Sequence, residues 1–117
     1  VLIKLGTNDT KPQNWKGKDA FKGDLADLIA HFRKLKSRPM VWVCLPVPVY
    51  GDRWGINAAT LDTVLEGVEE ACDDQKVPVI DLFDALSERA AMFPDKIHPD
   101  AKGAALMAKI IYQAIRP

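Results

Sequence analysis

The chain lacks an excess of charge of either sign. Sixteen lysine and arginine residues balance sixteen aspartate and glutamate residues over 117 positions, and no long block of like charge occurs. This balance argues against nucleic acid or another polyanion as a partner. The chain also lacks an apolar run of the roughly 20 residues that a membrane-spanning helix requires, so we expect no membrane partner either.

Cysteine is scarce as well, with only two residues. Cys44 lies in an apolar, strand-like run and Cys72 on the apolar face of a predicted helix, so both are expected to be small buried side chains. Neither stands at metal-ligand spacing from a histidine, and two such cysteines do not form a disulfide framework. The sequence argues against a zinc-stabilised or disulfide-stabilised domain and leaves the compartment undetermined.

The chain does contain a regular alternation of strand and helix patterns. Apolar runs predict strands at residues 1–5, 40–45 and 77–81. Helical spacing of apolar residues predicts helices at 19–36, 58–72, 82–90 and 99–114, with Asn57 as an N-cap and Pro99 in the first turn of the last helix. This order predicts one α/β unit with a parallel sheet and right-handed crossovers.

Two polar segments follow expected strands, at the edge of a parallel sheet where ligands usually bind. The first is Gly6–Thr10, and the second is Asp95–His98. Each has an ordinary structural explanation when taken alone. Asn8 can hydrogen-bond to its own backbone in a turn, and His98 can cap the last helix.

Taken together, the two segments resemble the motifs of one family. Leu5-Gly6-Thr7-Asn8-Asp9 resembles the G-x-N-D block of the SGNH (GDSL-type) serine hydrolases, and Asp95-Lys96-Ile97-His98-Pro99 resembles their D-x-x-H-P block. The order of the blocks and the elements between them also fit, and the resemblance covers essentially the whole chain. It implies a three-layer, flavodoxin-like α/β fold with a parallel sheet, of which residues 1–117 supply the third to fifth strands and their helices.

The resemblance implies a role for each motif residue. His98 is the expected general base, Asp95 orients its imidazole, and Asn8 donates to the oxyanion. Gly6 is expected to let the backbone turn at the strand end beside the substrate. Tyr50 and Trp54, in a loop rich in glycine and proline, either shape the substrate pocket or cover the core. No metal or organic cofactor is implied.

The chain departs from the family pattern in one respect. The blocks with the nucleophilic serine and an oxyanion-hole glycine normally precede the G-x-N-D strand, and this chain begins at that strand with Val1. The only serines, Ser37 and Ser87, have no Gly-Asp-Ser context. We therefore expect the C-terminal portion of one SGNH domain, inactive alone, whose serine comes from an upstream segment, either removed or present as a second chain.

The expected substrate is a small-molecule or carbohydrate ester. The segment from Pro46 to Trp54, followed by a helix and Ile80-Asp81-Leu82, resembles the O-acetylesterases that act on acetylated sugars of the sialate or xylan type. A polysaccharide substrate would favour a secreted or periplasmic location. Three alternatives remain open: a lipid esterase or lysophospholipase, a thioesterase, and a noncatalytic binding module that has lost its nucleophile.

Overall fold

A sheet of three short parallel strands forms the middle layer of the protein. The computed structural model describes residues 1–117. The strand order is β1-β2-β3, with strands β1 (Leu2–Ile3), β2 (Trp42–Cys44) and β3 (Val79–Ile80). Leu2 pairs with Trp42, and Cys44 pairs with Ile80. The parallel sheet predicted from the sequence is confirmed.

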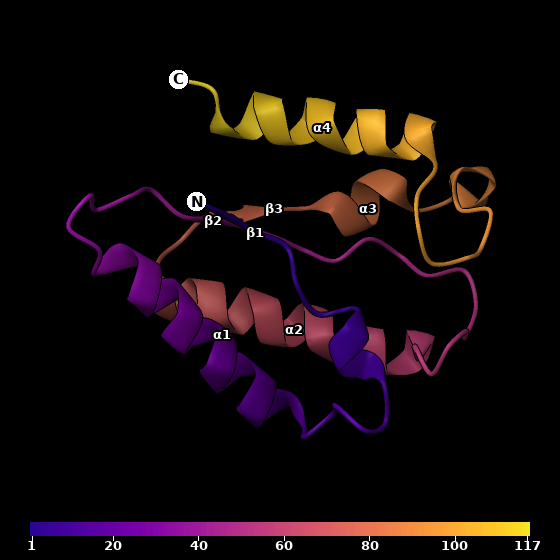
Figure 1. The fold of residues 1–117 in the computed structure, drawn as a ribbon, viewed down its shortest axis with the longest axis horizontal. Coiled ribbons are helices and arrows are strands. Elements are labelled where there is room, and N and C mark those ends of the chain that lie inside the picture. Colours follow the sequence, from indigo (N-terminus) through magenta and orange to yellow (C-terminus); the bar gives the residue numbers. More distant parts are fainter.

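Helices cover both faces of this sheet (Figure 1). On one face lie α1 (Lys18–Arg33) and α2 (Ala58–Gln75), which pack against each other. On the other face lie α3 (Leu82–Leu86) and α4 (Ala101–Ile115). Two 3₁₀ turns, η1 (Asn8–Thr10) and η2 (Ala90–Met92), stand in the loops. The result is a three-layer α/β arrangement.

The strands divide their side chains between two apolar cores, because successive residues of a strand point to opposite faces. Val43 belongs to the core beneath α1 and α2, whereas Cys44 belongs to the core beneath α3 and α4. Both cysteines are buried and unpaired, as expected. Burial raises the pKa of the Cys44 thiol, and raises that of Cys72 to about 11. Both therefore act as small apolar side chains.

Local capping groups set the ends of the helices. The Asn57 side chain accepts a hydrogen bond from the Thr60 N–H at 2.8 Å, which confirms Asn57 as the N-cap of α2. The cap of α4 is Asp100, whose Oδ1 accepts from the Gly103 N–H at 2.8 Å. The prediction that Pro99 opens this helix is wrong, because the cap follows it. The capping explanation of His98 is wrong for the same reason.

The short helix α3 is another difference from the sequence prediction. A helix was expected over 82–90, but α3 ends at Leu86. Ser87 leaves the helical conformation, with φ −60° and ψ 145°, and Glu88 is left-handed at φ 61°. A left-handed residue does not continue a right-handed helix.

The outer side of β1 has no neighbouring strand. Leu2 in this strand and Leu5 just after it are 42% and 55% exposed, whereas Ile3 is buried in the core. An open apolar strand edge of this kind readily pairs with another strand. None of the helices has the length and apolar character needed to cross a membrane.

Candidate active site

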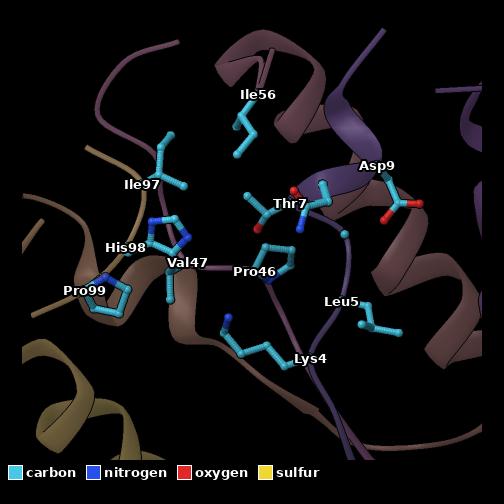
Figure 2. Close-up of a pocket in the computed structure, with 12 residues that line it drawn as sticks. Lys4, Leu5, Thr7, Asp9, Pro46, Val47, Ile56, Ile97, His98 and Pro99 are labelled. Carbon is cyan, nitrogen blue, oxygen red and sulfur yellow. The ribbon is translucent and has the colours of Figure 1, made fainter. Parts of the chain in front are cut away.

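A pocket opens at the carboxyl ends of the strands, where the sequence placed both motifs (Figure 2). It has a volume of about 230 Å³, below the range of roughly 300–1,000 Å³ common for ligand pockets. Its walls come from the loop after β1, the segment after β2 and the loop before α4. The lining residues include Gly6, Asn8, Pro46, Ile56, Ile97 and His98. The structure thus brings the two sequence motifs to one cavity.

The Asp95 carboxylate organises the loop that carries His98. Its Oδ2 lies 2.7 Å from His98 Nδ1, and its Oδ1 accepts from the backbone N–H groups of Ile97 at 2.8 Å and His98 at 2.6 Å. Lys96 is left-handed, at φ 71°, which lets the two following amides converge on the same oxygen. The His98 side chain is 69% exposed and lines the pocket. One carboxylate therefore fixes both the backbone and the imidazole.

These contacts lower the pKa of Asp95 to about 2. The hydrogen bond from the His98 backbone N–H contributes most, followed by the bonds from the His98 imidazole and the Ile97 N–H, while desolvation opposes them. The carboxylate is consequently ionised throughout the neutral range. An ionised acceptor holds the proton on Nδ1 and leaves Nε2 free to accept one, which is the state that a general base requires.

The loop after β1 presents Asn8 to the same pocket. Gly6 is in a positive-φ conformation at 128°, and a Cβ there would lie 2.7 Å from Val64 Cγ1, so only glycine fits. Asn8 is exposed and its side chain has no hydrogen-bond partner in the protein. The turn explanation, in which its side chain bonds to its own backbone, is not what the structure shows. The amide remains available to a ligand.

Thr10 holds this loop in place through two hydrogen bonds of its hydroxyl, a role that was not predicted from the sequence. Its side chain is buried, and its hydroxyl donates to the Thr7 carbonyl at 2.8 Å while accepting from the Asn57 N–H at 3.0 Å. The loop with Asn8 is thereby tied to the start of α2. Threonine at the end of a turn motif is a weak signal in the sequence, because its partner lies 47 residues away.

Asp9, next to Asn8, has a raised pKa. Partial burial is the main cause, nearby Asp24 adds to it, and a hydrogen bond with its own backbone opposes it. Asp9 lines the pocket as well. Its backbone N–H donates to the Gly6 carbonyl at 3.1 Å and closes the turn.

Tyr50 does not line the pocket. Its hydroxyl donates to the Leu86 carbonyl and accepts from the Arg89 N–H at 3.0 Å, and its ring packs on Phe93 with centroids 5.1 Å apart. Its backbone N–H donates to the Lys96 carbonyl at 2.9 Å. In this structure Tyr50 fastens the loop before α4 to the protein, and its expected contact with substrate stays a prediction.

Trp54 lies beside the pocket, next to the imidazole. The Trp54 and His98 ring centroids are 5.9 Å apart, and the Arg53 guanidinium carbon lies 4.4 Å from the Trp54 centroid. Arg53 Nη1 also donates to the Asp95 backbone carbonyl at 3.3 Å. Arg53 is not among the site residues predicted from the sequence, although a basic residue beside a tryptophan can form a cation–π pair.

Neither serine lines the pocket. Ser37 is exposed in the turns after α1, and the Ser87 hydroxyl donates to the Phe83 carbonyl at 2.8 Å at the end of α3. No group of three or more histidine, cysteine, aspartate or glutamate side chains is placed to hold a metal ion. The chain therefore places the His98 imidazole, with Asp95 paired to it, and the Asn8 amide at the pocket.

A three-layer parallel α/β fold with this Asp–His pair and asparagine turn at its strand ends is that of the SGNH hydrolases. The chain belongs to the GDSL-like lipase/acylhydrolase family, whose family model matches residues 1–106. It is 33% identical over 135 residues to an acetylxylan esterase of Xylanibacter ruminicola, an alignment that spans 99% of this chain and 28% of that protein.

Solved structures share the fold. An acylhydrolase from Bacteroides fragilis, described as putative, matches with a TM-score of 0.81 at 18% identity, over 98% of this chain and 60% of its own. An acetylxylan esterase from Geobacillus stearothermophilus matches with a TM-score of 0.78 at 19% identity, over 100% and 59%. The chain thus spans about 60% of the length of these structures and less than a third of the acetylxylan esterase from Xylanibacter.

The depressed pKa of Asp95 predicts a pH-dependent stability. In Asp95→Asn the amide oxygen still accepts from the backbone, but the amide nitrogen cannot accept from the imidazole. Because the pKa is lower in the folded state than the unfolded value of about 4, the carboxylate stabilises the fold above pH ~4 and loses this contribution as the pH falls toward 2. Urea unfolding of both proteins across this range should show the variant less stable above pH 4, with the difference vanishing near pH 2.

Asp27→Asn, on the exposed side of α1, is the control for removing one charge. A difference between wild type and Asp95→Asn that stays constant from pH 6 to pH 2 would mean that the carboxylate is not selectively stabilised in the fold.

Proposed function

We propose that this chain supplies His98, Asp95 and Asn8 to the active site of a serine ester hydrolase, and that the complete enzyme removes acetyl groups from carbohydrates. The observation that carries the proposal is the 2.7 Å contact of His98 Nδ1 with Asp95 Oδ2, at a pocket that Asn8 also lines. Membership of the GDSL-like family supports it.

In this mechanism His98 Nε2 takes the proton of a serine hydroxyl as its oxygen attacks the ester carbonyl. The tetrahedral intermediate carries a negative oxygen, to which the Asn8 amide donates. Collapse of the intermediate breaks the bond to the alcohol, which receives the proton from His98. A water molecule then attacks the acetyl-serine, with His98 again as the base, and acetate leaves as the serine regains its proton.

The serine, on this proposal, belongs to an upstream segment of the same protein that lies along β1. Neither Ser37 nor Ser87 lines the pocket, and the solved relatives are longer than this chain. The open edge of β1 supports the location, since Leu5, which follows it, is 55% exposed and lines the pocket. A segment covering this edge would bury apolar surface. It would also reach the pocket at Leu5 and so approach His98.

Two observations favour an acetylated carbohydrate as substrate. The chain is similar to an acetylxylan esterase along nearly its whole length, and the exposed indole of Trp54 lies beside His98, where a sugar ring can stack. The pocket of about 230 Å³ suits a small acyl group better than a long one. The rival function is a noncatalytic binding module, and it is separated from the enzyme by the experiment below.

Complementation tests the assignment of the serine and the base. The chain of residues 1–117 alone should not hydrolyse p-nitrophenyl acetate, and the upstream segment of its gene, added as a second polypeptide, should restore turnover. His98→Ala should then remove nearly all of the restored activity, because the imidazole paired with Asp95 is the group assigned to take the serine proton. Turnover by the lone chain that a serine-directed inhibitor abolishes would move the nucleophile to Ser37 or Ser87.

Asn8→Ala tests the oxyanion donor in the complemented enzyme. Its contact forms mainly in the transition state, so kcat should fall by about 10²–10³ with little change in KM. The matched control is Asn14→Ala, since the Asn14 side chain donates to the Asn8 backbone carbonyl and lies outside the pocket. A rise in KM at constant kcat would make Asn8 a substrate-binding residue instead.

The length of the acyl chain tests the substrate class. With the alcohol kept constant, p-nitrophenyl acetate should be hydrolysed with a higher kcat/KM than p-nitrophenyl octanoate, because the pocket offers little room for a long chain. Acetylated xylose should likewise release acetate. A preference for octanoate would overturn the acetylesterase assignment in favour of a lipid esterase.

A further inference from the structure

Trp54 has a backbone conformation that its side chain disfavours. Its φ is 53°, in the left-handed region, while its indole is 54% exposed. A bulky residue is strained in this region, and the strain persists only where the surroundings fix the conformation. A glycine would adopt this conformation without strain. The conformation of Trp54 therefore lowers the stability of the fold while it holds an aromatic ring beside His98.

Arg53 and its neighbours supply the restraint. The Arg53 backbone forms an antiparallel bridge with Ile56, with bonds of 3.3 and 2.9 Å, and Asp52 Oδ1 accepts from the Ala58 N–H at 2.9 Å. The loop is thereby anchored on α2. From this base the guanidinium reaches the Trp54 ring and the Asp95 carbonyl, and so links the indole to the loop that carries the imidazole.

The chemistry of ester cleavage decides which half of the substrate meets Trp54. The imidazole that deprotonates the serine must later protonate the leaving oxygen, so the alcohol lies on the His98 side of the scissile bond. The carbonyl oxygen of the acyl group lies toward the proposed oxyanion donor, Asn8. A ring centred 5.9 Å from the imidazole therefore stands next to the alcohol.

We propose that Trp54 forms the subsite for the leaving alcohol, a sugar ring, and that Arg53 is the positioning residue that holds the indole there. This inference rests on the proposed function and adds to it the half of the substrate that is recognised. The sugar presents its C–H groups to the indole face, and the protonated imidazole beside it delivers the proton to the departing hydroxyl oxygen.

The test uses the complemented enzyme and three esters: xylose tetraacetate, vinyl acetate and vinyl butyrate. The measured quantity is the ratio of kcat/KM for xylose tetraacetate to that for vinyl acetate, which have the same acyl group and different alcohols. Trp54→Ala should lower this ratio about tenfold, and Arg53→Gln about threefold, from the usual strengths of aromatic and cation–π contacts. Trp54→Phe should restore part of the ratio.

A double variant separates positioning from general damage. Because Arg53 acts through the indole, Arg53→Gln should lower the ratio no further in the Trp54→Ala background. Tyr112→Ala and Arg89→Gln make matched changes at an exposed aromatic of α4 and at an arginine outside the pocket, and should leave the ratio unchanged.

Three results would overturn the proposal in different ways. Equal losses on xylose tetraacetate and vinyl acetate in Trp54→Ala would assign the tryptophan to the fold or to His98 alone. A changed ratio of vinyl acetate to vinyl butyrate would place it on the acyl side. A parent enzyme inactive on all three esters would overturn the proposed function and the subsite together, whereas an active parent with unchanged ratios overturns the subsite only.

Discussion

The site depends first on the carboxylate of Asp95. Its two oxygens accept from two backbone amides and one imidazole nitrogen, all within three residues along the chain. The contacts that hold the loop in shape are thus the same contacts that hold the carboxylate ionised and the imidazole oriented. A local group of this kind loses little chain entropy when it forms, since no long loop has to close. This explains how His98 can stand in a largely exposed loop and still have a defined orientation.

A second, long-range set of contacts places that loop relative to Asn8. The Thr10 hydroxyl binds the start of α2 at Asn57, and the segment preceding Asn57 in turn holds the loop before α4 through Tyr50 and Arg53. Asn8 and His98 come from opposite ends of the chain. Both of their loops are nevertheless held by contacts with the start of α2 or with the segment just before it. On the proposed mechanism, a displacement of Asn8 by about 1 Å from the oxyanion would be enough to lose much of the catalytic rate.

The sequence predicted the layers of this fold and most of the motif residues, because apolar periodicity and the two motifs are local signals. It predicted the parallel sheet in the same way, through the alternation of strands and helices. It failed where a distant or unusual contact decides the structure. The end of α3 follows from a left-handed Glu88, the cap of α4 is Asp100 where an earlier start was expected, and Tyr50 turns to Leu86 and Arg89. No periodicity in the chain encodes these partners.

The distinction between local and distant contacts also decides which groups of the pocket are held in place within this chain. The His98 imidazole and the Asp95 carboxylate are positioned by their own loop, and Asn8 by a glycine turn and a buried threonine. These three groups therefore keep their geometry through contacts within residues 1–117. A nucleophile has no such local support here, because no serine stands at the pocket wall. The open edge of β1 offers unpaired backbone groups to another strand, and exposed Leu2 and Leu5 offer apolar surface beside it. On the proposed mechanism, docking of the nucleophile would complete the site, because the imidazole, its carboxylate and the amide are already held in place by contacts within residues 1–117.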